Sequence, residues 1–263
     1  MRKKLFRIIA SLVVCASAVL STAPVFAAHP LVTDDTGTQG RGKFQLEVNT
    51  EVGWDRDRED GITVKETSGE VSATFSAGLH DRVDLVLGVP YHWYHVKEND
   101  DTVAHNDGNG DISLEVKWRF YEEGGLSLAL KPGITIPTGS VGKGLGAGRV
   151  GYGAFFITQW ENEPWTFLVN LGYLRNENRV DERKDIWHGS FAVEREVVKD
   201  LKLVANAGLE TDPDPAQHTP AAFGIAGLIY SITENVDVDF GIKTGLSRPE
   251  TDFTLLAGIA WRF

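Results

Sequence analysis

The chain has 263 residues, a formal net charge of −11 and a single cysteine. This acidic balance argues against a nucleic-acid partner, because phosphate recognition needs a basic face. One cysteine cannot form an internal disulfide framework. After the first 27 residues no apolar run is long enough for a transmembrane helix, so any membrane crossing must use strands.

Residues 1–27 predict a secretory signal peptide, with four basic residues ahead of an apolar run over 8–20. Small residues place cleavage after Ala27, with Ala28 as the neighbouring alternative. Cys15 could mark a lipoprotein, but the bulky Val14 before it does not fit a lipobox. The mature chain therefore has no cysteine, and its 22 basic and 37 acidic residues give a net charge of −15.

A polar lead segment, residues 28–42, precedes a long region in which apolar and polar residues alternate with the period of a β-strand. Twelve strands are predicted, over residues 43–54, 70–79, 83–93, 111–120, 126–134, 152–160, 165–173, 187–198, 201–209, 221–230, 236–243 and 252–263. The eighth is the least regular, because Arg195 interrupts its apolar face unless that residue lies at a membrane interface. The last ends the chain on Trp261, Arg262 and Phe263, as the closing strand of an outer-membrane barrel does.

The connections alternate in length, with short turns near residues 80, 123, 162, 199 and 234 and longer loops near 60, 103, 143, 180, 215 and 248. We expect two of the longer connections, Asp55 to Glu66 and Lys97 to Gly110, to be loops. A soluble sandwich has no reason to alternate in this way. The sequence thus predicts an all-β fold: a removed signal peptide (1–27), a periplasmic lead segment or plug (28–42), and one antiparallel transmembrane β-barrel of about twelve strands (43–263) in the bacterial outer membrane, with short periplasmic turns and longer external loops.

The inward face of such a barrel would be charged. The lumen-facing candidates for solute passage are Glu47, Glu51, Glu115, Lys117, Arg119, Lys131, Asp237, Asp239 and Lys243, together with Glu70, Asp84 and Lys202. These side chains could form a polar conduit, or they could be structural ion pairs that fill a narrow barrel.

Two motifs suggest chemistry but fit it poorly. The glycine-rich stretch Gly139 to Gly148 lacks the Ser or Thr that a phosphate loop needs after Lys143, and a flexible external loop explains it better. His92 and His95 are three apart on a strand and so face opposite sides, which argues against a metal site. We expect no catalytic residues, no metal and no cofactor.

The lead sequence from His29 to Gly40, the following Gln45/Glu47 strand, the loop Pro137-Thr138-Gly139 and the aromatic end resemble the MetA-pathway of phenol degradation family. The resemblance covers nearly all of the mature chain. It implies an outer-membrane barrel near the long-chain fatty-acid porins, regarded as a transporter of small, aromatic or otherwise hydrophobic molecules, and supplies no catalytic residues.

We therefore expect a channel or transporter for small solutes, surrounded by outer-membrane lipid and inserted by the barrel assembly machinery through the strand that ends at Phe263. A non-conducting structural or surface-interaction barrel is the alternative, and a lipid-modifying enzyme is a third hypothesis. Asp34 and Asp35 could pair with inward cations on Lys117, Arg119, Lys131, Lys202 and Lys243, so that the lead segment plugs the periplasmic mouth. A disordered periplasmic tail is the other interpretation of this segment.

Overall fold

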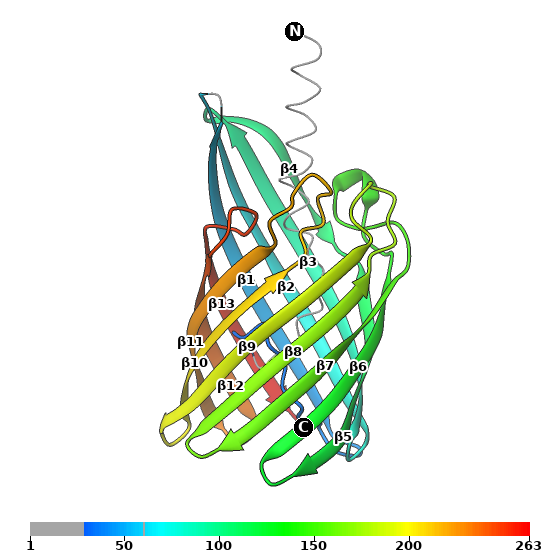
Figure 1. Ribbon diagram of the computed structural model, residues 1–263, viewed down its shortest axis with the longest axis vertical. Helices are drawn as coiled ribbons and strands as arrows, with labels where there is room; N and C mark the ends of the chain where they lie inside the picture. The colour runs from blue at the N-terminus through cyan, green and yellow to red at the C-terminus, as the bar shows by residue number, and fades with distance from the viewer. Residues whose placement is uncertain (1–28, 60) are drawn as a thin grey trace.

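The computed structural model describes residues 29–59 and 61–263, so the predicted signal peptide lies outside the described residues. The described chain forms antiparallel strands around a lumen (Figure 1). Their bounds are β1 (Phe44–Glu59), β2 (Ile62–His80), β3 (Val83–Glu98), β4 (Asp101–Asn109), β5 (Ile112–Glu123), β6 (Leu126–Ile136), β7 (Gly151–Asn162), β8 (Trp165–Arg175), β9 (Asp185–Val198), β10 (Leu201–Glu210), β11 (Ala221–Thr233), β12 (Val236–Gly245) and β13 (Phe253–Arg262).

The barrel has twelve wall positions, because β4 and β5 share one of them. Both pair with β3, β4 from Tyr91 upward and β5 from Gly88 downward, with a break at residues 110–111. Pairing of β1 with β13 and of β2 with β3 closes the sheet. Closure satisfies the backbone hydrogen bonds that an open edge would leave exposed to lipid. The predicted all-β, twelve-strand antiparallel barrel is confirmed.

The outward faces carry two levels of aromatic side chains. Phe44 stacks on Phe75 with ring centroids 5.7 Å apart, and ten residues further along β1 Trp54 lies 6.0 Å from Phe253. Ten residues span roughly 33 Å along a strand, or about 25 Å of height at the usual tilt of barrel strands. Two aromatic levels at this spacing are what the two interfaces of a membrane require.

The irregular eighth strand is also confirmed, as β9. Its Arg195 guanidinium lies 4.8 Å from the centroid of the Trp165 ring. Trp165 stands at the start of β8, at the end of the barrel that carries the short turns. The charge on the outward face therefore lies in an aromatic interface and not in the middle of the apolar band.

Short turns connect the strands at one end, at residues 81–82, 124–125, 163–164, 199–200 and 234–235, as predicted. The longer connections lie at the opposite end (Figure 1). We call these the short-turn end and the long-loop end.

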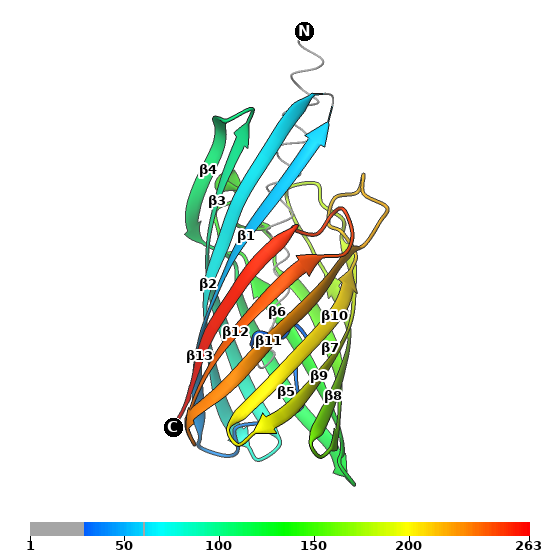
Figure 2. The ribbon, with the colours of Figure 1, turned by 90° about the vertical axis from the view of Figure 1, so that its left-hand side faces the viewer.

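Two of the predicted loops are wrong. The stretches Asp55 to Glu66 and Lys97 to Gly110 are hairpins formed by the continuing strands β1–β2 and β3–β4, which rise beyond the rest of the barrel (Figure 2). We call this region, residues 55–58, 62–67, 94–98 and 101–107, the four-strand extension. Both of its faces are polar or mixed because it lies beyond the aromatic level, so the apolar alternation that marks a lipid-facing strand is lost there.

The glycine-rich connection between β6 and β7 is anchored against this extension, contrary to the expected flexible loop. It contains a 3-10 turn, η2 (Val141–Lys143), and the Asp111 carboxylate accepts hydrogen bonds of 2.8 Å from both Gly139 N and Ala147 N. Its Leu145 packs on Tyr94 and Val96, on the inner face of the extension. The extension is therefore backed by an apolar cluster.

No helix among the described residues is both long and apolar enough to cross a membrane. The described chain also contains no cluster of three or more His, Cys, Asp or Glu side chains placed to hold a metal ion. His92 is buried in the lumen while His95 is exposed on the outside, so the predicted opposite orientation of these two histidines is confirmed.

The closing strand pair suggests a first test. Phe44 and Phe263 exchange both backbone hydrogen bonds, at 2.8 and 2.9 Å, and their rings stack with centroids 5.8 Å apart. A charge at this position would remove the ring stacking, worth about 0.5–1.5 kcal/mol, and would add an interfacial carboxylate at a cost of at most about 1 kcal/mol. We expect Phe263→Asp to lower the fraction of heat-modifiable, folded barrel in membranes several-fold. Lys199→Asp, a charge change at an exposed turn, is the matched control and should fold normally; equal yields of both variants would contradict the closing role.

Candidate functional site: the lumen and its lead segment

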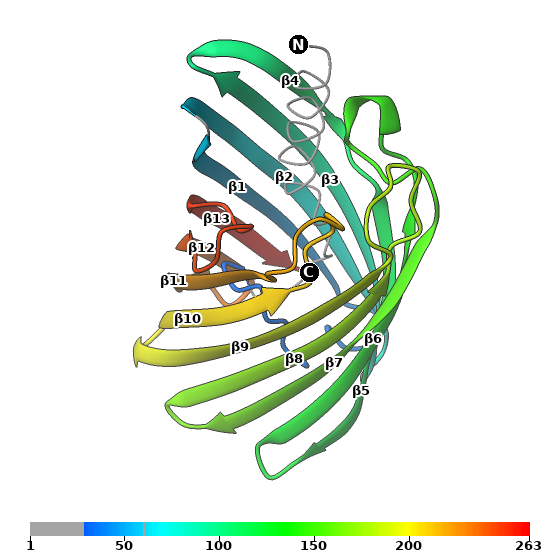
Figure 3. The same ribbon diagram turned by 45° about the horizontal axis from the view of Figure 1, so that its top comes forward.

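The lead segment, described from residue 29 to residue 42, runs inside the barrel. It leaves β1 at the short-turn end and follows the inner wall past β3, β5, β9 and β10 to β12, and parts of it are visible in blue between the strands (Figure 3). Leu31, Thr33, Asp34 and Thr36 are at most 3% exposed. A segment of this polarity can be buried only if the lumen wall supplies partners for its polar groups.

Asp34 is bound by two lysines of the wall. Its Oδ1 lies 2.8 Å from Lys117 Nζ on β5 and its Oδ2 lies 2.7 Å from Lys131 Nζ on β6. Lys131 Nζ is also 3.6 Å from Glu115 Oε2. The side chains of Asp34, Lys131 and Glu115 are 4% or less exposed, and buried charges persist only when paired. Asp34 thus balances two neighbouring ammonium groups at once.

The backbone of the lead segment bonds mainly to wall side chains, although the Gly42 N–H donates to the Gly78 carbonyl of β2 at 2.8 Å. Asn206 Oδ1 accepts from the N–H groups of Val32 (2.7 Å) and Thr33 (3.1 Å). Asp84 Oδ2 accepts from Gln39 N–H at 2.9 Å. In the amide orientation that satisfies both of its atoms, Asn170 accepts from the Asp34 N–H at 2.6 Å and donates to the Asp34 carbonyl at 3.0 Å. These contacts meet the requirement that buried backbone groups be paired.

A chain of hydrogen bonds continues from Thr33 into the wall. Thr33 Oγ1 donates to Ser190 Oγ (2.8 Å), which lies 3.0 Å from His188 Nε2. His188 Nδ1 lies 3.0 Å from Glu210 Oε2. Serine, histidine and glutamate in this order could suggest a nucleophile, but Ser190 is 7% exposed and covered by Thr33. The arrangement serves to hold the lead segment.

Apolar contacts complete the docking site. Leu31, 1% exposed, packs in a cluster with wall residues of β8, β9, β10 and β11, namely Leu168, Ala192, Val204 and Ile229. Pro30 lies over the facing glycines Gly227 and Gly241, where an added Cβ would come within 2.6 Å of its ring. The wall therefore has a recess at the place where the proline lies.

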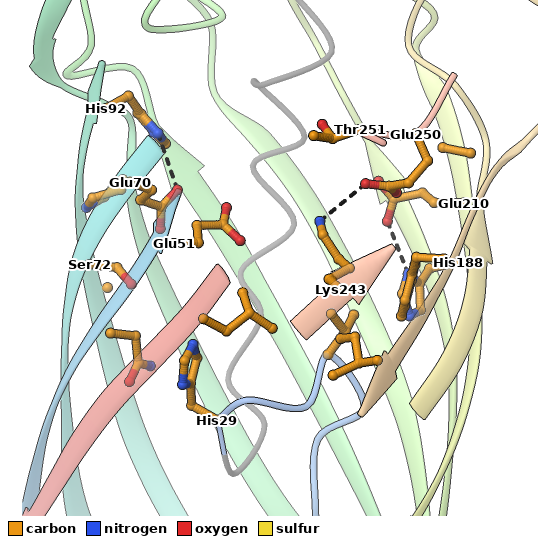
Figure 4. Close-up of a pocket in the computed structure, with 18 of the residues that line it drawn as sticks. His29, Glu51, Glu70, Ser72, His92, His188, Glu210, Lys243, Glu250 and Thr251 are labelled. Carbon is orange, nitrogen blue, oxygen red and sulfur yellow. Dashed lines mark hydrogen bonds and ion pairs between the residues drawn. The ribbon is translucent and has the colours of Figure 1, made fainter. Parts of the chain in front are cut away.

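The lead segment lies between two cavities. The long-loop cavity, of about 180 Å³, contains Glu51, Glu70, His92, His188 and Lys243 in its lining (Figure 4). The short-turn cavity, of about 570 Å³, is lined by residues that include Asp34, Glu47 and Arg262. His29, which forms an ion pair with Asp239 through Nδ1, lines both cavities. It therefore stands at the boundary between them.

Three close polar contacts line the long-loop cavity, two between a histidine and a carboxylate and one between a lysine and a carboxylate, and Figure 4 shows them as dashed lines. His92 Nδ1 is 3.1 Å from Glu70 Oε2, Lys243 Nζ is 3.1 Å from Glu250 Oε1, and His188 pairs with Glu210 as described. Carboxylates outnumber cations in this lining: Glu51, Glu70, Asp111, Glu210, Asp212 and Glu250 face one lysine, Lys243. The cavity therefore has a negative potential that favours neutral or cationic molecules.

The structure gathers some of the predicted lumen residues and separates others. Glu115, Lys117 and Lys131 meet around Asp34, and Asp35 lies 3.4 Å from Lys117 Nζ. The remaining predicted residues lie elsewhere: Glu51 and Lys243 in the long-loop cavity, Glu47, Asp237 and Asp239 in the short-turn cavity, and Arg119 beside Glu122 with an Nε–Oε2 distance of 3.4 Å. Arg119 lines neither cavity and makes no contact with the lead segment within the described chain.

Several residues that hold the lead segment carried little signal in the sequence. Alternation places Asn206 and His188 on the inward face, but nothing marks them as partners of residues 32 and 33. Because a charged inward face was expected, the inward apolar residues near Leu31 were not predicted. The recess at Gly227 and Gly241 could have been suspected, because two glycines on adjacent strands leave a gap.

The family model described as "Putative MetA-pathway of phenol degradation" matches residues 29–263. The match spans the lead segment and every strand. The chain belongs to this family. No curated protein sequence matches it significantly.

Solved structures resemble the barrel at low sequence identity and so support the fold alone. The COG4313 outer membrane channel from Pseudomonas putida F1 is similar with a TM-score of 0.67 and 14% identity, over 87% of this chain and 98% of that one. The NanC porin aligns with a TM-score of 0.53 and 12% identity over 82% and 98%. The translocator domain of the autotransporter NalP from Neisseria meningitidis gives 0.51 and 13% over 85% and 89%. In outer-membrane barrels as a class, the short turns are periplasmic and the longer loops are external.

The Asp34 site gives a second test, for which the absence of cysteine from residues 29–263 is convenient. A Thr36→Cys reporter, at a position 1% exposed, should react slowly with a maleimide. Adding Asp34→Asn leaves Lys117 and Lys131 without their shared counter-charge, which costs about 3–5 kcal/mol for a buried pair. We expect labelling to accelerate at least roughly a hundredfold.

Asp35→Asn is the matched control, because it removes the same charge from the adjacent residue. The Asp35 side chain is 36% exposed, and an exposed pair contributes about 0–1 kcal/mol. Its labelling rate should change by less than about fivefold. If both variants label at the same rate, Asp34 does not hold the segment.

Proposed function

We propose that the protein is a passive outer-membrane channel for small solutes, and that its lead segment restricts passage by dividing the lumen. The observation that carries this proposal is the position of residues 29–36 between two cavities that reach opposite ends of one barrel. Thr251 and Pro249 of the long-loop end line one cavity, and Asn235 of a short turn lines the other. A barrel that served only as a scaffold would have no need for a cavity at each end.

The contacts of the lead segment suit a reversible closure. No strand pairs with residues 29–42, and β1 joins β2 and β13 from Phe44 and Gln45 onward. The barrel wall is therefore complete without the segment. Because the docking contacts are ion pairs, side-chain hydrogen bonds and one apolar cluster, water can replace most of them when the segment leaves. Displacement would join the two cavities into one path.

The long-loop cavity also suggests which solutes enter. Carboxylates and histidines line both sides of this cavity (Figure 4), and an apolar strip in which Phe223, Ile225 and Leu256 pack with Val32 of the lead segment lies on β11 and β13. An aromatic or otherwise hydrophobic molecule with a neutral or cationic polar group would contact both surfaces. This pairing of apolar walls with few polar groups is usual in small-molecule sites. A link to phenol-like compounds rests on the family description and on this strip.

Two alternatives remain testable. A non-conducting structural or surface-interaction barrel would keep the lead segment docked permanently, and its two cavities would never connect. A lipid-modifying enzyme would need an accessible nucleophile, and the Ser190–His188–Glu210 arrangement is the described group closest to one. Hydrolysis of lipid substrates by the pure protein, lost in Ser190→Ala, would support the enzyme.

Deleting residues 29–40 tests the channel proposal. The deletion removes Asp34, Leu31 and Pro30 but leaves every strand intact. We expect single-channel conductance in planar bilayers to rise several-fold over the intact protein, because the two cavities would become continuous. Solute leak from liposomes, measured with a small aromatic amine and with a sugar of similar size, should rise as well.

The folded state of the deletion protein is checked by its heat-modifiable migration on gels. If the folded deletion protein conducts no better than the intact one, the lead segment does not restrict passage. If neither protein conducts, the barrel is not a channel. Cells with and without the gene, compared for uptake of the same solutes, then show whether conductance reflects transport.

A further inference from the structure

The outward face of the four-strand extension concentrates basic side chains. Arg56 of β1, Lys65 of β2 and Lys97 of β3 are directly opposite one another across three adjacent strands, since Arg56 pairs with Lys65 and Lys65 with Lys97. Arg58 follows two residues beyond Arg56 on the same face. Like charges in direct cross-strand register destabilise a sheet unless an anion compensates them.

The acidic residues of the same strands lie on the other face. Asp55 and Asp57 alternate with Arg56 and Arg58, and Glu66, 7% exposed, is adjacent to Lys65. Asp57 is engaged by Arg248 at 3.3 Å. Acidic and basic groups are therefore separated by the pleat of the strands, and the outward side carries a local positive charge on a chain that is strongly acidic overall.

One carboxylate faces the basic row. Asp100, in the turn between β3 and β4, lies 2.7 Å from Lys65 Nζ. This hydrogen bond, with the charges of Lys65, Lys97 and Arg56, lowers the pKa of Asp100. Arg56, Arg58 and Lys97 form no ion pair within the described chain. A second carboxylate, Asp107 of β4, lies lower on the same face, opposite Trp93 and bonded by Tyr91. Two carboxylates cannot neutralise four cations, so the face retains an excess positive charge.

The aromatic side chains below the basic row indicate its height relative to the membrane. Trp54 and Trp93 point outward at the upper aromatic level, and Arg56 follows Trp54 by two residues. Two residues rise about 6–7 Å along a strand. Interface aromatics mark the boundary between the hydrocarbon and the headgroups, so the cations lie at headgroup level on the external side.

We propose that Arg56, Arg58, Lys65 and Lys97 form a binding site for the phosphate groups of the phosphorylated glycolipid in the outer leaflet. The site rests on the outer-membrane location of the barrel and is independent of conduction. Guanidinium and ammonium groups recognise phosphate by charge-assisted hydrogen bonds, and arginine does so in a bidentate manner. The packing of Leu145 behind the extension holds the sheet in place before lipid binds, which lowers the entropic cost of association.

The surface chemistry favours a membrane lipid over a soluble polyanion. The row continues downward into Trp54 and Trp93, which would contact acyl chains while the cations contact phosphates. His95 and His105, with ring centroids 6.4 Å apart, flank the site on β3 and β4 and add polar donors at the same level. A free phosphate or soluble polyanion would use the cations but would not need the aromatic row.

The test compares lipid binding by the intact mature barrel and by Arg56→Gln/Lys65→Gln/Lys97→Gln, using native mass spectrometry in a zwitterionic detergent. The probe is bisphosphorylated lipid A, with its dephosphorylated form and inorganic phosphate as separate arms. Removing one to two cations near a charged surface weakens binding about tenfold. The variant lacks three cations and should therefore bind lipid A roughly a hundredfold more weakly. The difference should shrink at high salt.

The matched control removes three exposed external cations from the opposite side of the barrel, as Arg149→Gln/Arg179→Gln/Lys184→Gln. It should bind lipid A within about threefold of the intact protein. The proposal requires that dephosphorylated lipid bind the intact barrel as weakly as bisphosphorylated lipid binds the first variant. It is overturned if the first variant binds normally, if both lipid forms bind equally well, or if inorganic phosphate displaces the lipid at equal concentration.

Discussion

The lumen depends on one ionic contact, the bridge from Asp34 to Lys117 and Lys131. Two ammonium groups on neighbouring strands face the same enclosed space, and Glu115 lies close enough to Lys131 to offset part of their charge. The lead segment brings the missing carboxylate into that space. Its other contacts, with Asn206 and the Leu31 cluster, then follow from where Asp34 must lie.

A closed barrel can accommodate such an arrangement in its lumen without losing stability in its wall. Every strand except β4 of the four-strand extension has a partner on both sides, so the wall keeps its backbone hydrogen bonds whatever the interior contains. Inward-facing side chains can therefore form contacts with whatever lies in the lumen, because the sheet does not depend on them for its stability. The recess at Gly227 and Gly241 shows this, because glycine weakens a strand but leaves room for Pro30. We therefore expect the barrel to fold with or without a docked lead segment.

Alternation with period two was sufficient to predict the barrel, because one face of each strand must be apolar in lipid. The same signal disappears beyond the aromatic level, which is why the hairpins from Asp55 and Lys97 were mistaken for loops. Alternation also indicates which side chains point inward, but not which of them meet. That Lys117 and Lys131 share Asp34, while Arg119 lies apart beside Glu122, depends on strand register and on the path of the lead segment.

The sequence contained less information about the docking of the lead segment. The partners described above come from at least eight different strands, at separations along the chain as large as 210 residues between His29 and Asp239. No local pattern encodes such pairings. The composition of residues 29–42 suits a loose tail as well as a folded plug. Only the positions of Leu31 and Thr33 inside the barrel distinguish the two.

The account depends most on movement of the lead segment, and a reversible tether measures that directly. Thr33 Oγ1 and Ser190 Oγ are 2.8 Å apart, and the mature chain has no other cysteine, so Thr33→Cys/Ser190→Cys can form one defined disulfide between segment and wall. The oxidised protein should show conductance well below that of the intact protein, and reduction in the same bilayer should restore it. Equal conductance before and after reduction, with the disulfide verified by mass spectrometry, would contradict a channel gated by this segment.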